Sequence, residues 1–188
     1  MSAYSDHKQK WKTCTRCPLH RTRNRVVLGK GSLPCDVLFI GESPGESEDD
    51  LGSPFKGRAG DLLDRIILEA VDLLIDGDDL RLKFAFTNVI GCIPLEDGDK
   101  RDPIKAEIQS CASRLVEFSQ MASPIAIVCL GELSATWVPK LVDMPDVRLI
   151  NLPHPSRILR IESPHAQKTL MKQTTVRLAN LLSWVSEC

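Results

Sequence analysis

The chain has 188 residues, of which 43% are hydrophobic and 26% charged, and its net charge at pH 7 is -1. This length suits one domain (residues 1–188), and the near-neutral charge excludes a general attraction to polyanions, so nucleic-acid binding would require a local basic patch. The first residues lack the apolar core of a secretion signal, and no apolar run is long enough to span a bilayer. We therefore expect a soluble, cytoplasmic protein.

Seven cysteines in such a compartment are not expected to form a disulfide framework. Cys14 and Cys17 form a C-x-x-C pair, a spacing that metal sites, clusters and redox dithiols all use. Cys92 and Cys111 offer a second pair, with the alternative that Cys111 is a core residue of a helix. The spacing favours a four-cysteine site over that alternative. Cys129 lies in an apolar strand and is expected to pack in the core.

After a short polar helix and a basic loop at residues 21–25, apolar runs alternate with helical patterns. The apolar runs predict strands at residues 36–41, 84–90, 125–130 and 147–152. Apolar positions at helical spacing predict a helix over about residues 59–75, namely Leu62, Leu63, Ile66, Ile67, Ala70, Val71 and Leu74.

Two further helices are predicted from paired start signals. Asp102-Pro103 and Ser163-Pro164 each combine an N-cap residue with a first-turn proline. The inward faces are predicted to be Ile104, Ile108, Cys111 or Ala112, Leu115 and Phe118 in the first helix, and Leu170, Leu178, Leu181, Leu182 and Val185 in the second.

Strands that alternate with helices of this length predict a sheet covered on both faces. We therefore expect an α/β fold, a three-layer α/β/α sandwich with a central four-stranded parallel sheet. Glu42, Asn88, Gly131 and His154 fall at or just after strand ends. Parallel strands bring their carboxyl ends to one rim, where open α/β sheets bind ligands, so the candidate site is predicted there.

Residues 41–60 carry three groups suited to this rim. Glu42 could orient a water molecule or stabilise positive charge on a sugar ring. Phe55 either stacks on an extruded base or anchors its loop in the core. Arg58 lies between Gly57 and Gly60 at a helix start, where backbone N–H groups could bind an anion. Glycine-rich turns of this kind are common, so this pattern is a weak signal by itself. The acidic residues that follow Glu42 are expected to form a solvated run, with capping of a turn as the alternative; they are Glu46, Glu48, Asp49 and Asp50. The loop of residues 95–99 is expected to face solvent.

Asn88 has a side-chain amide that could pair with the N3–H and O4 of a uracil edge and would reject cytosine. The alternative is an asparagine that fixes a loop through backbone hydrogen bonds. His154 lies between Pro153 and Pro155, which indicates an imidazole held in place. Such an imidazole could donate to an oxygen that gains negative charge, although a structured turn with a satisfied histidine is the alternative.

Arg157, Ile158 and Leu159 follow this histidine and resemble a wedge that enters a base stack while arginines hold phosphates. The alternative is an ordinary helix start.

Four segments then occur in a fixed order: Gly41-Glu42-Ser43-Pro44-Gly45, Pro54-Phe55-Lys56-Gly57-Arg58-Ala59-Gly60, Thr87-Asn88-Val89 and His154-Pro155-Ser156. With Cys14, Cys17, Cys92 and Cys111, they resemble the family 4 uracil-DNA glycosylases, the iron–sulfur branch of that superfamily. The resemblance extends from Cys14 to the final helix. It implies a structural [4Fe–4S] cluster on the four cysteines, and hydrolysis of the N-glycosidic bond of uracil in DNA to leave an abasic site.

The resemblance also implies site roles. Catalytic roles fall to Glu42, at the water and the sugar charge, and to His154, at the leaving-group oxygen. Phe55 would stack on uracil, Asn88 would read its edge, and the backbone at Ser43 would line the pocket. DNA contacts are expected from Lys56, Arg58, Arg157 and Arg160.

The expected partner is uracil-containing DNA, single- or double-stranded. No membrane association is expected, and the protein is expected to be a monomer. Two departures from the family pattern are a longer, more acidic segment after Cys92 and an arginine at position 157. The alternatives are a glycosylase for another deaminated or modified base, and a non-catalytic DNA-binding iron–sulfur module. A nucleotide-binding protein is less favoured, because neither a Walker loop nor a dinucleotide fingerprint follows the first strand.

Overall fold

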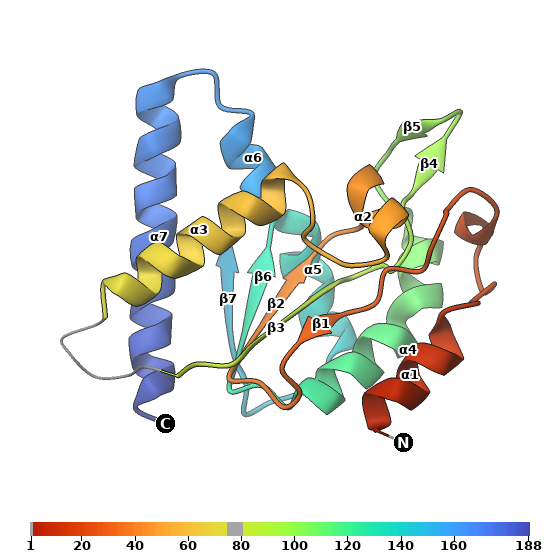
Figure 1. Ribbon diagram of the computed structural model, residues 1–188, viewed down its shortest axis with the longest axis horizontal. Coiled ribbons are helices and arrows are strands. Elements are labelled where there is room, and N and C mark those ends of the chain that lie inside the picture. Colours follow the sequence, from red (N-terminus) through yellow and green to blue (C-terminus); the bar gives the residue numbers. More distant parts are fainter. Residues whose placement is uncertain (1, 75–80) are drawn as a thin grey trace.

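A five-stranded sheet with the strand order β1-β3-β2-β6-β7 forms the centre of the molecule, as Figure 1 shows. The computed structural model describes residues 2–74 and 81–188. The strands of this sheet are β1 (Lys30–Gly31), β2 (Val37–Gly41), β3 (Phe84–Asn88), β6 (Ala126–Leu130) and β7 (Arg148–Leu152). The last four are parallel to one another, which confirms the predicted α/β class and all four predicted strands.

The predicted sheet is wrong in one respect, because β1 adds a fifth, antiparallel strand at the edge. It pairs Lys30 with Phe86 and Gly31 with Ala85. Two residues are too few to leave a period-two pattern, and both β1 residues lack an apolar side chain, so the sequence carries no signal for this strand.

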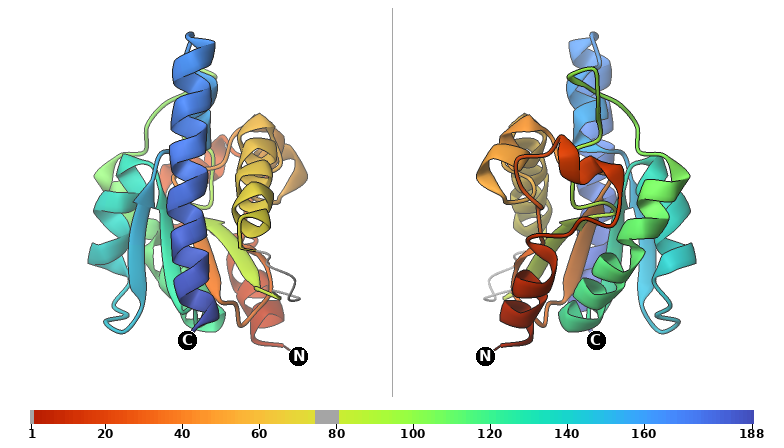
Figure 2. Two further views of the ribbon diagram at one scale, coloured as in Figure 1. Left: turned by 90° about the vertical axis from the view of Figure 1, so that its left-hand side faces the viewer. Right: turned by 90° about the vertical axis from the view of Figure 1, so that its right-hand side faces the viewer.

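Helices cover both faces of the sheet, as the left panel of Figure 2 shows for α3 and α7 on one side and α4 and α5 on the other. The helices are α1 (Ala3–Trp11), a 3-10 turn η1 (Pro18–Arg21), α2 (Glu46–Leu51), α3 (Arg58–Asp72), α4 (Lys105–Ala122), α5 (Glu132–Leu141), α6 (Pro155–Leu159) and α7 (Pro164–Ser186). No helix of the described ranges is long and apolar enough to cross a membrane.

Strand β2 is buried along its whole length and contributes side chains to two hydrophobic cores, one on each face of the sheet. Leu38 and Ile40 belong to the core shared with α1, α4 and α5, whereas Val37 and Phe39 belong to the core shared with α3, α6 and α7. Because alternate residues of a strand point to opposite faces, a continuous apolar run is required where both faces are covered. Cys129 in β6 is fully buried, as expected.

Helix α4 begins two residues later than its Asp102-Pro103 signal predicts. The N–H of Ile104 donates to the carboxylate of Glu107 at 3.0 Å, and Arg101 holds that carboxylate with two further bonds. Glu107 therefore caps the helix from inside its first turn. As a result Ile104 stands outside the helix and is 55% exposed, which contradicts its predicted place on the buried face.

Helices α3 and α7 lie close to their predicted positions. Helix α3 starts at Arg58 and ends at Asp72, and the last predicted residue, Ile75, lies outside the described residues. Helix α7 starts at Pro164, with the Ser163 hydroxyl accepting from the N–H of Ala166 at 3.4 Å.

The segment after Cys92 forms a hairpin of β4 (Leu95–Glu96) and β5 (Asp99–Lys100), where the sequence predicted a loop. Its turn residues, Asp97 and Gly98, have φ values of 51° and 92°. Positive φ at both positions is the geometry of a two-residue hairpin turn, for which Asp-Gly is a preferred sequence. The hairpin rises at the same rim as the carboxyl ends of the strands, opposite the two chain termini (Figure 1).

Candidate active site

A cleft of about 1450 Å³ opens at the carboxyl ends of β2, β3, β6 and β7. Its lining includes the five residues for which the sequence predicted catalytic or substrate-binding roles: Glu42, Ser43, Phe55, Asn88 and His154. The parallel register explains this convergence, because it aligns Gly41 with Asn88 and Leu130 with Leu152 at the strand ends. Four separate chain segments thus place side chains in one hollow, polar ones from three segments and the Phe55 ring from the fourth.

Asn88 and Phe55 both lie close to the position that a Cβ of residue 41 would occupy. A Cβ at Gly41 would stand 2.4 Å from Oδ1 of Asn88 and 2.9 Å from Cζ of Phe55. No side chain other than hydrogen fits there, so this glycine permits the close approach of the amide and the ring. Asn88 is 3% exposed. An amide and an aromatic face held this way can pair with and stack on one flat heterocycle.

Phe55 is held from three sides, with a φ of 53° that residues other than glycine seldom adopt. Its N–H donates to Glu48 at 2.8 Å, and its carbonyl accepts from Lys30 at 3.3 Å. Its ring is 5.9 Å from that of Phe86 and only 4% exposed. The ring therefore anchors its loop in the core and also lines the cleft.

The imidazole of His154 is neutral and has a fixed proton position. Burial lowers its pKa to about 4, and the positive charges of Lys100 and Arg160 act in the same direction. Its Nδ1 accepts from the N–H of Ser156 at 3.2 Å, beside the Ser156 hydroxyl at 2.8 Å. The proton therefore resides on Nε2, which can donate into the cleft without carrying a positive charge.

Glu42 lines the same cleft and is half-buried. Burial raises the pKa of its carboxyl above the ordinary value of 4.5; Asp102 also raises it, whereas Lys100 and Arg160 lower it. In its ionised form this group can accept a proton from water or face a developing positive charge.

Ser43 offers an unsatisfied polar atom beside Glu42. Its side chain is buried, and within the described part of the chain its hydroxyl oxygen has no hydrogen-bond partner. Buried polar groups normally have partners, so a free hydroxyl in the cleft is available to a bound ligand.

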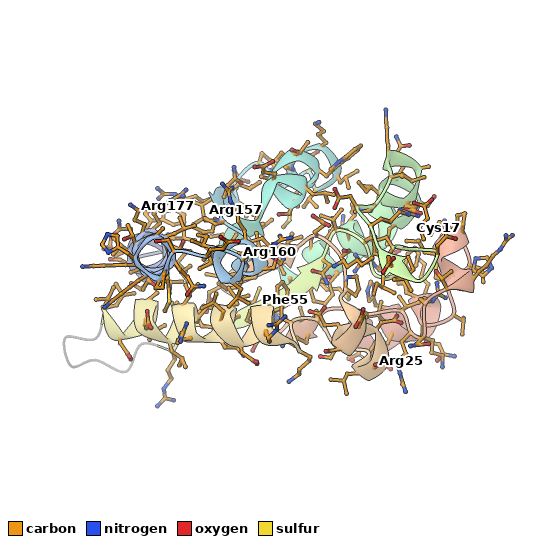
Figure 3. All side chains as sticks on the ribbon, turned by 90° about the horizontal axis from the view of Figure 1, so that it is seen from above. Cys17, Arg25, Phe55, Arg157, Arg160 and Arg177 are labelled. Carbon is orange, nitrogen blue, oxygen red and sulfur yellow. The ribbon has the colours of Figure 1, made fainter. Side chains whose placement is uncertain are left out.

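Basic side chains from several elements line the cleft, and in Figure 3 Arg157 and Arg177 lie on the opposite side of Phe55 from Cys17, with Arg160 between them and Phe55. Arg58, Arg157 and Arg160 were predicted as nucleic-acid contacts and line the cleft, whereas Lys56 is exposed but does not line it. Arg177 joins the lining from the middle of α7, where no sequence motif marks it.

The structure adds residues that sequence reasoning missed. Lys100 and Arg101 reach the cleft from the hairpin, whose Asp-Gly turn was a readable signal. In the acidic run, Glu48 accepts from the N–H groups of Gly45 and Phe55, which agrees with the predicted alternative of a turn cap. The predicted exposure to solvent is wrong for Asp49, which is 3% exposed and accepts from the N–H of Asn24 at 2.7 Å. The bond to Gly45 is a local capping pattern, whereas no local pattern revealed Phe55 and Asn24 as partners.

The four predicted cysteine ligands lie in or against one apolar core with Trp11 and Leu19; they are Cys14, Cys17, Cys92 and Cys111. All four are free. The pKa of Cys92 is raised to about 11, mainly by burial; Cys111 and Cys17 also raise it, whereas Arg23 lowers it. Among the described residues, no three metal-binding side chains are arranged as ligands of a metal ion.

Backbone and guanidinium donors point at two of these sulfurs. The N–H of Gly91 and the Nε of Arg114 donate to Cys111 Sγ at 3.4 and 3.2 Å, and Arg23 donates to Cys92 Sγ at 3.3 Å. Donors of this kind stabilise negative charge on sulfur, so the side chains fit a thiolate-ligated cluster.

A mainly parallel α/β sandwich with a buried amide, an aromatic ring, a carboxylate and a neutral imidazole in one rim cleft defines a protein of the base-excising glycosylase class. The family model described as the uracil DNA glycosylase superfamily matches residues 28–178. The chain therefore belongs to the uracil DNA glycosylase superfamily.

Curated relatives are similar over most of the chain. A type-4 uracil-DNA glycosylase of Archaeoglobus fulgidus is 33% identical over 77% of this chain and 67% of the relative. That of Thermotoga maritima is 33% identical over 86% and 85%, and that of Pyrobaculum aerophilum is 36% identical over 70% and 62%.

Proposed function

We propose that this chain is a uracil-DNA glycosylase that hydrolyses the N-glycosidic bond of a flipped-out deoxyuridine and leaves an abasic site. The observation that carries the proposal is the convergence of Phe55, Asn88, Glu42 and His154 in one cleft of a chain that belongs to this superfamily. We further propose that it acts on DNA inside the cell, as a single-domain monomer.

Base capture begins with stacking on the ring of Phe55 and pairing to the amide of Asn88. These contacts offset the unstacking of the target nucleotide. Pairing to N3–H and O4 selects uracil over cytosine, because cytosine presents the reversed donor and acceptor pattern and would leave the buried amide unpaired. The hydroxyl of Ser43 supplies one further hydrogen-bonding group at the pocket wall.

Bond cleavage leaves negative charge on the departing base and positive charge on the sugar. The Nε2–H of His154 donates to the base oxygen as its charge grows, and needs no proton transfer because the imidazole is already neutral. The Glu42 carboxylate stabilises the sugar and orients the incoming water.

We also propose that Cys14, Cys17, Cys92 and Cys111 hold a [4Fe–4S] cluster. These sulfurs come from three separate segments of the chain, so a group bound to all four would cross-link the N-terminal segment, the loop after β3 and helix α4. The donors at Cys92 and Cys111 support this assignment.

The proposal is tested by incubating the protein with oligonucleotides that contain uracil, hypoxanthine, xanthine or a modified pyrimidine, followed by alkaline cleavage at abasic sites. Release of uracil is expected, with a loss of about 100-fold or more in Asn88→Ala, because the buried edge contact is removed. Val176→Ala, an exposed change on α7, serves as the control. Release of another base alone, or binding without release, would refute the proposal.

A further inference from the structure

Arg114 on helix α4 is a buried cation with an unusual set of partners. It is 1% exposed, and it forms no ion pair with a carboxylate among residues 2–74 and 81–188. A guanidinium keeps its charge in proteins, and an uncompensated buried charge is costly. Its charge must therefore be balanced by the groups that it contacts.

These contacts join two sites that the chain keeps apart. Nε donates to Cys111 Sγ at 3.2 Å. Nη1 donates to Thr87 Oγ1 at 3.1 Å, and Nη2 donates to the carbonyls of Asn88 and Val89, the latter at 3.0 Å. One rigid, planar group therefore spans the cysteine site and the strand end that carries the base-reading amide.

The local structure leaves room for the Arg114 guanidinium beside the end of β3. Strand β1 pairs with β3 only as far as Phe86, so the outer edge of β3 has no strand neighbour beyond it. A Cβ at Gly91 would lie 3.0 Å from Nε and 3.2 Å from Cδ of Arg114, so the glycine makes room for the side chain. The N–H of Gly91 shares the Cys111 sulfur with Arg114.

We propose that Arg114 is a positioning residue that couples the cysteine site to base recognition. Negative charge held at Cys111 fixes the guanidinium, and the guanidinium fixes the main chain at Asn88 and Val89. When the charged group at the cysteines is lost, the guanidinium loses its counter-charge and the amide of Asn88 loses its fixed position. This inference rests on the proposed function, because it assigns base reading to Asn88.

Arg23 provides a matched comparison. It also donates to a cysteine sulfur, Cys92 Sγ at 3.3 Å, and to the carbonyl of Cys14, but the structure gives it no bond to β3. Both arginines place a positive charge beside the cysteine site, and Arg114 alone of the two is bonded to the base-reading strand.

The test compares Arg114→Met, Arg114→Lys and Arg23→Met, each purified with its iron and characterised for iron content, cluster midpoint potential, steady-state kinetics on uracil-DNA and amide hydrogen exchange. Both methionine variants are expected to shift the midpoint to more negative values, because a cation beside the cluster is lost. Arg114→Lys keeps the charge and is expected to restore the potential without restoring the fork-shaped contacts.

Substitutions at Arg114 and at Arg23 are expected to have different effects on the base-binding pocket. In Arg114→Met, exchange at the N–H groups of Val89 and Ile90 accelerates, since these donate to Gly41 and Glu42 across the strand end. KM rises about tenfold with kcat less affected, a size usual for coupling between sites. In Arg23→Met, exchange and KM remain as in the wild type. Unchanged exchange in Arg114→Met, or the same loosening in Arg23→Met, would overturn the proposal.

A second measurement applies if Arg114→Met does not fold. The wild-type chain is stripped of iron with an oxidant and a chelator, and exchange is followed at both ends of the rim. Faster exchange at Val89 and Ile90, with the Gly131 N–H to the Leu152 carbonyl unchanged, supports the coupling. Equally accelerated exchange at both ends of the rim, or acceleration at neither end, contradicts the coupling. Exchange and potential need no turnover, so the absence of uracil release would refute the proposed function alone.

Discussion

Side chains at the cleft are tuned by burial more than by direct partners. Burial is the largest cause of both the raised pKa of Glu42 and the lowered pKa of His154. Desolvation disfavours the charged form of both groups, and the cations Lys100 and Arg160 oppose it at Glu42 but reinforce it at His154.

This tuning predicts the acid limb of the pH profile of kcat/KM. As the pH falls, Glu42 takes up its proton above pH 4.5, before His154 protonates at about 4, so Glu42 sets the limb. Asp102→Asn removes a charge that raises the pKa of Glu42 but is not a cause of the shift at His154, and it is expected to move the limb to lower pH. Lys105→Gln, an exposed change outside the cleft, is the control. An equal shift in both variants would contradict this assignment.

Gly41 gives a second prediction at this scale. In Gly41→Ala the new Cβ overlaps Asn88 Oδ1 and Phe55 Cζ, so either the amide or the ring must move. We expect kcat/KM to fall by about 100-fold, because displacements near 1 Å carry such penalties. In the control, Gly57→Ala, the nearest atom to the Cβ is Ser47 Oγ at 3.8 Å, an ordinary contact. Wild-type kinetics in Gly41→Ala would show that the pocket tolerates the methyl group.

Short elements beside the cleft hold its shape through their caps. Helix α2 has six residues and a first-turn glutamate, Glu48, that binds the N–H groups of both Gly45 and Phe55. One carboxylate therefore ties the start of α2 to the loop that carries the stacking ring. The strained backbone at Phe55 depends on this bond.

Glu48→Ala is expected to destabilise the fold by about 1–2 kcal/mol, the range for lost caps, and to raise KM because the Phe55 loop is released. Denaturant unfolding and steady-state kinetics measure the two effects. Leu51→Ala changes an exposed residue of the same helix that does not line the cleft, and it is expected to alter neither. A stability loss without any change in KM would limit Glu48 to a purely structural role.

At the scale of the whole molecule, the candidate DNA-binding features lie at one end of the sheet. The cleft, the hairpin and the basic residues gather at the carboxyl rim, and both termini lie at the opposite end (Figure 1). With a net charge of -1, attraction to DNA must come from the rim rather than from the overall field.

The dependence of DNA affinity on salt tests this separation. Each phosphate contact contributes about 0.9 to the slope of log K against log salt concentration. Arg157→Gln at the rim is expected to reduce the slope by about that amount. Lys83→Gln removes the same charge just before β3 begins, at the opposite end of that strand, and is expected to leave the slope unchanged. Equal slopes in the two variants would place the DNA elsewhere.

Local chemistry in the sequence determined the four parallel strands, the principal helices and the strand-end positions of Glu42, Asn88 and His154. These features arise from periodicity, caps and prolines, which act between near neighbours. The same local signals failed at Ile104, where the start of the helix is set by Glu107 and not by Asp102-Pro103.

The tertiary structure alone decided which groups support these residues. Arg114 meets Cys111 and the end of β3, Asp49 meets Asn24, and Lys100 acts on both Glu42 and His154. Most of these partners are separated by more than twenty residues in the chain. Their pairing depends on how the strands are ordered and how the helices pack, and no local pattern encodes that arrangement.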